Sequence, residues 1–349
     1  ELTLSRGFQS SVAPELHFGI GKAEKIDELK VVWTDGKVQV VNNPTINKTI
    51  ILKHSDASEE KVEVSTSDKL FMTDTSNLFP SYKHEENVND DFENQVLLPH
   101  KMSTFGPALA VGDLNNDNLE DYYIGASKGK KGAIFLQNES GFKESTLDFD
   151  ENSEDLGATI FDADGDGDND LYVVSGGYEY KADSKNLQDR LYLNDGKGNF
   201  TKANEGTLPK MITSGSKVYH ADFDADGKED VLVLGRQTPG NYPLPASSYL
   251  LKNNSKNGIA KFDVFTEMMP KEFTDLGMAT SAVITDYNND KMLDIIVVGE
   301  WMPIRVFKNT KTGFSDVSEE LGLTVDTTGW WWSINQGDFD NDGDMDYIL

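Results

Sequence analysis

Five short acidic segments carry the residues with the clearest chemistry. Each spans nine residues and has Asp or Asn at its first, third, fifth and ninth positions. The segments, called loops one to five below, read DLNNDNLED from Asp113, DADGDGDND from Asp162, DFDADGKED from Asp222, DYNNDKMLD from Asp286 and DFDNDGDMD from Asp338. Calcium takes about six to eight oxygen ligands in a flexible shell, which carboxylates at alternating positions of a tight loop can supply. We therefore interpret all five as calcium-binding loops.

The predicted side-chain ligands occupy the same four positions in every loop. In loops two, three and five all are carboxylates: Asp162, Asp164, Asp166, Asp170; Asp222, Asp224, Asp226, Asp230; Asp338, Asp340, Asp342, Asp346. In loops one and four an Asn replaces one carboxylate: Asp113, Asn115, Asp117, Asp121; Asp286, Asn288, Asp290, Asp294. The backbone carbonyl of the seventh residue would add another ligand, so little room remains for a substrate. We expect up to five structural calcium ions.

The sixth position distinguishes the loops. It is Gly167, Gly227 and Gly343 in three loops, but Asn118 in loop one and Lys291 in loop four. If this position has a left-handed backbone, Gly adopts it freely, Asn tolerates it, and Lys is strained by roughly 1 kcal/mol. The same two loops lack one carboxylate. The sequence therefore predicts that loops one and four bind calcium most weakly.

The alternatives to a calcium loop of this type are an EF-hand and a simple acidic turn. An EF-hand needs a bidentate Glu at position twelve and a helix on each side. Position twelve here is apolar in every loop: Ile124, Val173, Val233, Val297 and Leu349. Asp, Asn and Gly are also common in turns without any metal. The same ligand spacing recurs in five loops, each flanked by apolar strands. This recurrence favours metal binding over simple turns.

The loops recur within a larger repeat at intervals of roughly 50 to 65 residues. An apolar strand such as residues 108–111 precedes the loop, and another such as residues 122–124 follows it. A hairpin comes later, as in residues 190–193 and 199–201. Four short strands per repeat are typical of a β-propeller blade. The predicted fold is all-β, with at least five four-stranded blades.

The N-terminal part has a different pattern. Residues 29–33, 37–41 and 49–52 read as strands of a small β-module spanning 1–54, with a hairpin turn at Asp35-Gly36. Residues 55–68 are polar and acidic and read as a linker, and residues 69–349 form the propeller. Residues 70–74 would be a last blade strand that closes the ring. The chain ends within an expected strand, which predicts a fragment of a larger protein.

Several sequence signatures resemble known families. RGFQSS from Arg6, LHFGIG from Leu16 and VWTDG from Val32 resemble the ASPIC/UnbV segment of bacterial repeat proteins. Phe105-Gly106-Pro107 followed by loop one resembles the FG-GAP/VCBS repeat, the blade type of integrin α subunits, and this resemblance covers residues 70–349. It implies a propeller that commonly has seven blades, so the chain would be truncated at its C-terminus.

Composition narrows the possible partners. Acidic residues number 60 against 32 basic ones, for a net charge of −28. Nucleic acid and anionic membrane surfaces both require a basic patch, so neither is an expected partner. No apolar run reaches the roughly 18 residues that a membrane span needs. The chain has no Cys, and no HExxH motif occurs, so we assign no catalytic residue.

Aromatic residues mark a possible ligand surface on the face away from the loops. Tyr178, Tyr180, Tyr242 and Trp301 lie in the connections between second and third strands, and the run of Trp330, Trp331 and Trp332 enters its blade from the same side. Such side chains can stack on sugars or anchor a protein, although many propeller aromatics simply pack between blades. We expect a secreted, periplasmic or outer-surface module that binds protein or glycan. The alternatives are an enzyme resembling polysaccharide lyases and a purely structural part of a larger surface protein.

Overall fold

The computed structural model describes residues 16–61 and 79–349. The chain divides into two compact units, Glu1–Thr73 and Asp74–Leu349, each described here by itself. The RGFQSS motif from Arg6 and the strand predicted at residues 70–74 lie outside the described residues. Described helical elements are short 3-10 turns: η1 (His54–Asp56), η2 (Asp91–Glu93), η3 (Lys185–Leu187), η4 (Lys271–Asp275) and η5 (Val325–Thr327). None of the described helices could cross a membrane.

The first unit contains a three-stranded antiparallel sheet of β1 (Glu28–Val32), β2 (Lys37–Asn42) and β3 (Ser58–Lys61). Its first hairpin turns at the predicted place, where Gly36 has a φ of 85°. The strand predicted at residues 49–52 is wrong, because β3 pairs with β2 instead. Ile51 is 83% exposed, so the apolar run there gains no buried face that would hold it in a sheet.

The second unit has the predicted all-β architecture of four-stranded blades. The first two sheets are β4 (Leu109–Gly112), β5 (Asp121–Ile124), β6 (Ala133–Asn138), β7 (Gly141–Thr146), and β8 (Glu154–Phe161), β9 (Asp170–Gly176), β10 (Arg190–Asn194), β11 (Phe200–Lys202). The third is β12 (Gly215–Ala221), β13 (Asp230–Gly235), β14 (Tyr249–Asn253) and β15 (Phe262–Val264). The fourth is β16 (Met278–Thr285), β17 (Asp294–Met302), β18 (Arg305–Asn309) and β19 (Phe314–Asp316), with β20 (Gly329–Trp330) paired to β17. β21 (Asn335–Gly337) and β22 (Asp346–Ile348) form a further pair.

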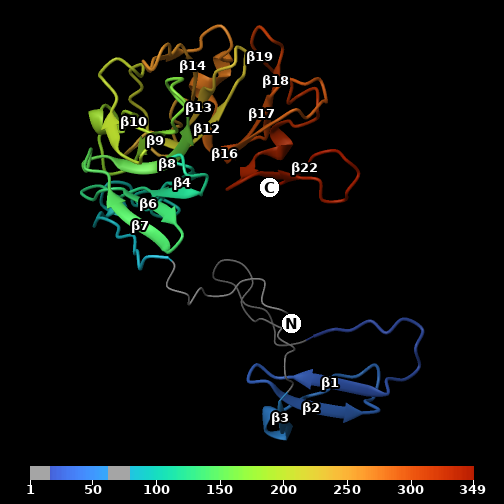
Figure 1. Ribbon diagram of the computed structural model, residues 1–349. Helices are drawn as coiled ribbons and strands as arrows, with labels where there is room; N and C mark the ends of the chain where they lie inside the picture. Colours follow the sequence, from blue (N-terminus) through green and yellow to red (C-terminus); the bar gives the residue numbers. More distant parts are fainter. Residues whose placement is uncertain (1–15, 62–78) are drawn as a thin grey trace. The chain divides into compact units, whose positions relative to one another are not determined.

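The sheets follow one another round an arc in chain order (Figure 1). The first strands lie next to each other, since β4 packs on β8, β8 on β12, β12 on β16 and β16 on β21. The cores lie between consecutive blades. Tyr123 and Ile134 of the first sheet pack with Leu171 and Tyr192 of the second, and all four side chains are buried. Each blade thus buries apolar residues against its neighbours, as repeat folds do.

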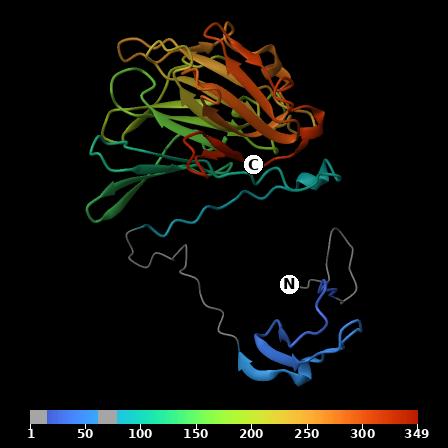
Figure 2. The same ribbon diagram turned by 90° about the vertical axis from the view of Figure 1, so that its right-hand side faces the viewer.

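The segment before β4 passes along one side of the blades as an extended strap (Figure 2). The Asn87 side chain donates a hydrogen bond to Glu179, and Gln95 donates one to the backbone carbonyl of Tyr242 at 3.1 Å. These contacts lie at the blade edges away from the acidic loops, where β9 and β13 end. The strap therefore contributes side chains to that face.

Candidate metal centres

Each acidic loop joins the first strand of a blade to its second strand. Loops one to four connect β4 to β5, β8 to β9, β12 to β13 and β16 to β17, and loop five connects β21 to β22. Antiparallel pairing of these strands brings the first and ninth residues of a loop close together. In β8 and β9, for example, Phe161, the residue just before the first Asp of loop two, pairs with the ninth residue, Asp170. The sheet register therefore closes each loop.

The first Asp of each loop holds the loop backbone together. In loop two, Asp162 Oδ2 accepts a hydrogen bond from the Gly167 amide at 3.0 Å, and Oδ1 accepts one from the Gly165 amide at 2.8 Å. The sixth-residue amide makes the same bond in the other loops, at 2.7 to 3.1 Å. The third-position Asp164 accepts from the Asp166 amide at 3.1 Å. Asp and Asn favour such local turns because their short side chains reach nearby amides.

The left-handed backbone anticipated at position six is present in all five loops, and position four shares it. The φ angles at these positions lie between 59° and 95°. Lys291 adopts a φ of 69°, which costs a non-Gly residue about 1 kcal/mol. At position four the residue is Gly in loop two, Ala225 in loop three and Asn elsewhere. The Asn or Gly at position four of loops one, two, four and five is a sequence signal for this second left-handed position.

In loops one to four the ninth Asp is buried and links the loop to the third strand of its blade. In loop two, Asp170 Oδ2 accepts from the Ala163 amide at 3.0 Å, and Oδ1 accepts from the Asn194 amide at 2.8 Å. The Asn194 side chain continues to the preceding blade, donating to the Leu114 carbonyl at 2.8 Å. Asn253 and Asn309 repeat this link to the loop before them. The loops therefore also join neighbouring blades.

Burial changes the acidity of the ninth-position carboxyls. It raises the pKa of Asp170 and Asp230 to about 7 and that of Asp294 to about 6, although backbone amides partly oppose the effect. The pKa of Asp121 is raised in the same way. Nearby ligand carboxylates add to the rise at all four residues, because like charges disfavour ionisation. A bound cation would relieve both costs.

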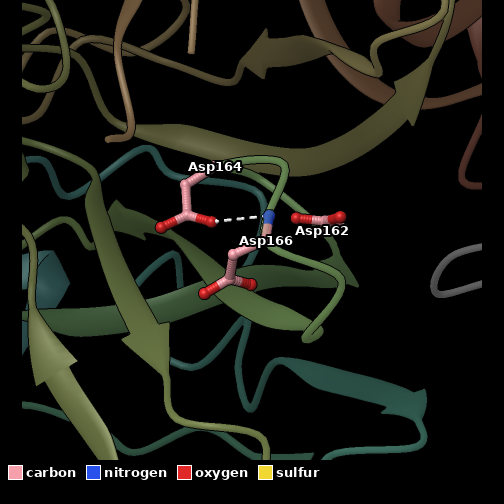
Figure 3. A group of neighbouring side chains, drawn as sticks. All are labelled: Asp162, Asp164 and Asp166. Atoms are coloured by element: carbon pink, nitrogen blue, oxygen red, sulfur yellow. Dashed lines mark hydrogen bonds between the residues drawn. The ribbon is translucent and has the colours of Figure 1, made fainter. Parts of the chain in front are cut away.

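Three loops bring carboxylates together closely enough to share a cation. In loop two, one oxygen each from Asp162, Asp164 and Asp166 lies within 4.8 Å of the others (Figure 3). Two other groups meet this criterion in the described residues, in loops three and five: Asp222, Asp224, Asp230; Asp338, Asp340, Asp346. Clustered carboxylate oxygens held by backbone amides suit a hard divalent cation, so the residues present fit calcium.

Loops one and four arrange their Asn ligands differently. In loop one, Asn115 Oδ1 accepts from the Asp117 amide at 3.1 Å, so its oxygen occupies the place of the missing carboxylate oxygen. In loop four, the Asn288 amide nitrogen donates to Asp294 at 2.9 Å. That loops one and four bind calcium most weakly remains a prediction from the sequence.

Comparison with protein families identifies the repeated unit. Residues 113–173, 174–233 and 250–349 match the model of the FG-GAP-like repeat. The chain belongs to the FG-GAP-like repeat family. Residues 1–59 match the ASPIC and UnbV model. Both resemblances drawn from the sequence are therefore confirmed.

No curated protein matches this FG-GAP chain. Among solved structures it is similar to the exotype rhamnogalacturonan lyase YesX, with 12% sequence identity and a TM-score of 0.34. The match covers 71% of the FG-GAP chain and 56% of the lyase chain. The FG-GAP chain thus corresponds to little more than half of that protein, and the likeness is too distant to indicate a shared activity.

On the face opposite the loops, three of the predicted aromatic residues meet. Trp301 Nε1 donates a hydrogen bond to Tyr242 Oη at 2.6 Å, and the ring centroids of Trp301 and Trp330 are 5.0 Å apart. Trp332 lies beside them, 6.4 Å from Trp330. We call Tyr242, Trp301, Trp330 and Trp332 the tryptophan cluster. Trp301 is 57% exposed and Trp332 54%, so two indoles face solvent.

Buried charges lie beneath the tryptophan cluster of the FG-GAP unit. Arg236 pairs with Glu300, whose side chain is fully buried. The Arg236 guanidinium also lies 5.4 Å from the Trp332 ring centroid and 4.9 Å from that of Phe105. His100 Nε2 is 3.8 Å from Glu300, and burial lowers the pKa of His100. Phe105, His100 and this ion pair were absent from the ligand surface predicted from the sequence.

The other predicted aromatic residues lie elsewhere in the FG-GAP unit. Tyr178 is buried with Leu98 and Met102 of the strap. Tyr180 is buried, and its hydroxyl donates to the Asn152 carbonyl at 2.9 Å. Trp331 packs between the last two strand groups and donates to the Thr327 carbonyl at 3.1 Å. These three side chains contribute to packing and lie outside the tryptophan cluster.

Proposed function

We propose that this chain is a calcium-binding module of an exported or surface-exposed protein. The observation that carries the proposal is the convergence of three carboxylates within 4.8 Å in each of loops two, three and five. In the metal-free chain these carboxylates repel one another, and in loops two and three the ninth Asp is buried and has a raised pKa. Calcium would neutralise them and brace each blade. Extracellular calcium, at about millimolar concentration, would fill even sites of modest affinity.

Isothermal titration calorimetry of the metal-free chain tests this proposal. We expect saturable calcium binding with a stoichiometry of three to five ions, because three loops cluster carboxylates and two carry an Asn. The double variant Asp162→Asn/Asp164→Asn should remove one of these ions, since it neutralises two ligands of loop two while preserving their shape. Absence of calcium binding at millimolar metal would overturn the proposal.

We further propose that the tryptophan cluster binds a glycan, with a protein partner as the alternative. Support comes from two exposed indoles held in place rather than packed away. Trp301 has a φ of 55°, a strained conformation for a bulky residue, and its ring is braced by Tyr242 and Trp330. Strain at an exposed aromatic residue is a common mark of a functional surface. Exposed indole faces suit the apolar faces of sugar rings.

A glycan array probed with the calcium-loaded chain tests the second proposal. We expect binding to weaken about tenfold in Trp301→Ala and to persist in Trp301→Phe, because the latter keeps an aromatic face. Leu244→Ala serves as a control, since Leu244 is an exposed apolar residue outside the cluster. Shortened or unsaturated sugars would favour a lyase-like enzyme. Absence of any bound glycan would favour a protein partner or a purely structural role.

A further inference from the structure

The third strands of the four complete blades differ at one position close to the acidic loop. The reference point is the residue whose backbone amide donates to the ninth Asp: Gln137, Asn194, Asn253 and Asn309. The residue just before it is Leu136 in the first blade and Leu193 in the second. In the third and fourth blades it is Lys252 and Lys308. At this position two blades therefore carry an apolar side chain and two carry a cation.

Lys252 reaches two predicted ligands of loop three. Its ammonium pairs with Asp224, and it lies 3.1 Å from Asp226 Oδ2. The ammonium is also 4.7 Å from the centroid of the Phe265 ring, which holds it over the loop. Partial burial opposes the charge of Lys252, but hydrogen bonds to the two carboxylates raise its pKa overall. A positive charge thus already neutralises part of this ligand set.

Lys308 makes the corresponding contact with loop four. Its ammonium lies 3.2 Å from Asp290 Oδ2, the fifth-position ligand. It contacts one ligand where Lys252 contacts two, and its side chain is more exposed, at 37% against 26%. We therefore expect the same effect in loop four, but smaller.

Loops two and three are the best comparison for the effect of the lysine, and the Lys252→Met variant separates that effect from their other sequence differences, such as Gly165 against Ala225 at position four. Both have Asp at all four ligand positions and Gly at position six. Calcium that binds in loop three must displace the Lys252 ammonium from Asp224 and Asp226. The bound ion then lies close to a like charge. Charge-assisted contacts between a lysine and carboxylates are among the stronger polar interactions, and like charges at short range repel. Loop two has Leu193 at the corresponding place and meets neither cost.

We propose that Lys252 and Lys308 are tethered counter-cations that divide the calcium loops into two affinity classes. Loops three and four bind calcium more weakly than loop two, and their lysines neutralise part of the ligand charge when the metal is absent. This inference rests on the proposed calcium function. It departs from the sequence ranking, which placed loop three among the stronger sites. Calcium depletion would then empty loops three and four before loop two.

A calcium titration followed by NMR at single loops tests the inference. The amides of Gly167 and Gly227 each donate to the first Asp of their loop, so their signals report loops two and three separately. We expect Gly227 to titrate at higher calcium than Gly167 in the natural chain. Lys252→Met should tighten binding at Gly227 by about tenfold and leave Gly167 unchanged. Lys217→Met removes a charge from an exposed position of β12 in the same blade and should change neither.

A reciprocal variant keeps the inference testable if Lys252→Met fails to fold. Leu193→Lys should weaken binding at Gly167 by a similar factor, because it places an ammonium over loop two. If both glycines titrate but neither variant shifts its own loop, the inference is overturned while the calcium proposal stands. If neither glycine responds to millimolar calcium in the natural chain, the calcium proposal itself fails. Equal affinities of loops two and three in the natural chain would also contradict the two classes.

Discussion

Removing calcium with EGTA should lower the midpoint of thermal unfolding by about 10 °C or more at pH 8. One site filled at 100 times its dissociation constant contributes about 2.7 kcal/mol, and several sites act together in this chain. For domains of about 150–250 residues, 1 kcal/mol corresponds to about 2–4 °C, and the shift is smaller in a larger chain. The loss should be large because the loops brace each blade and, through Asn194, Asn253 and Asn309, connect neighbouring blades. Circular dichroism melts with and without calcium measure the effect.

The difference between the calcium-loaded and metal-free melts should depend on pH. In the metal-free fold the pKa values of Asp170, Asp230 and Asp294 are about 7, 7 and 6, above the ordinary value of 3.8. A raised carboxyl pKa favours the fold at low pH, and this contribution is lost as pH rises from about 4 to about 7. Calcium keeps the same groups ionised. The calcium-dependent stabilisation should therefore grow between pH 5.5 and pH 8.

Two controls sharpen this result. Magnesium at the same concentration should restore little of the lost stability, because it requires a smaller octahedral shell and gives up water reluctantly. Asp162→Asn/Asp164→Asn should retain only part of the calcium effect, since one loop no longer contributes. Coincident melts with calcium and with EGTA at pH 8 would contradict the bracing role assigned to the loops.

Arg190→Met should destabilise the second unit by about 3–5 kcal/mol, the cost of leaving one partner of a buried ion pair alone. Arg190 and Asp155 are both about 95% buried, with a nitrogen–oxygen distance of 2.6 Å. Asp155 also accepts hydrogen bonds from the Tyr123 hydroxyl and the Ala126 amide, each at 2.7 Å. The pair therefore connects the first two blades. A lower urea midpoint for unfolding would report the loss.

A surface pair provides the matched comparison. Lys202 and Asp150 also lie 2.6 Å apart, but the Lys202 side chain is 45% exposed. Lys202→Met should cost less than about 1 kcal/mol, because solvent screens an exposed pair. The double variant Arg190→Met/Asp155→Leu should recover part of the stability by removing both buried charges. Equal urea midpoints for the two single variants would show that burial of the Arg190–Asp155 pair has no special role.

The loops were predictable because their determinants are local. Asp, Asn and Gly alternate within nine residues, and those nine residues also form the hydrogen bonds to the first Asp. The left-handed sixth position followed from Gly167 and Gly343 in the same way. The strand predicted at residues 49–52 was wrong, because β2 pairs with β3 and not with that segment. An apolar run indicates a strand but does not indicate which neighbour will pair with it.

The sequence by itself determined the acidic loops, their ligand types, the repeat length and the blade architecture. These properties depend on residues close together in the chain, where turn preference and side-chain alternation act directly. Only the tertiary structure placed Lys252 over loop three, joined Arg236 to Glu300, and gathered Trp301, Trp330 and Trp332 into one cluster. Those contacts depend on how blades pack and on the register of strands far apart in the chain. A local sequence pattern does not indicate which distant residues will come into contact. The lysine contacts that distinguish the loops are therefore visible only in the folded chain.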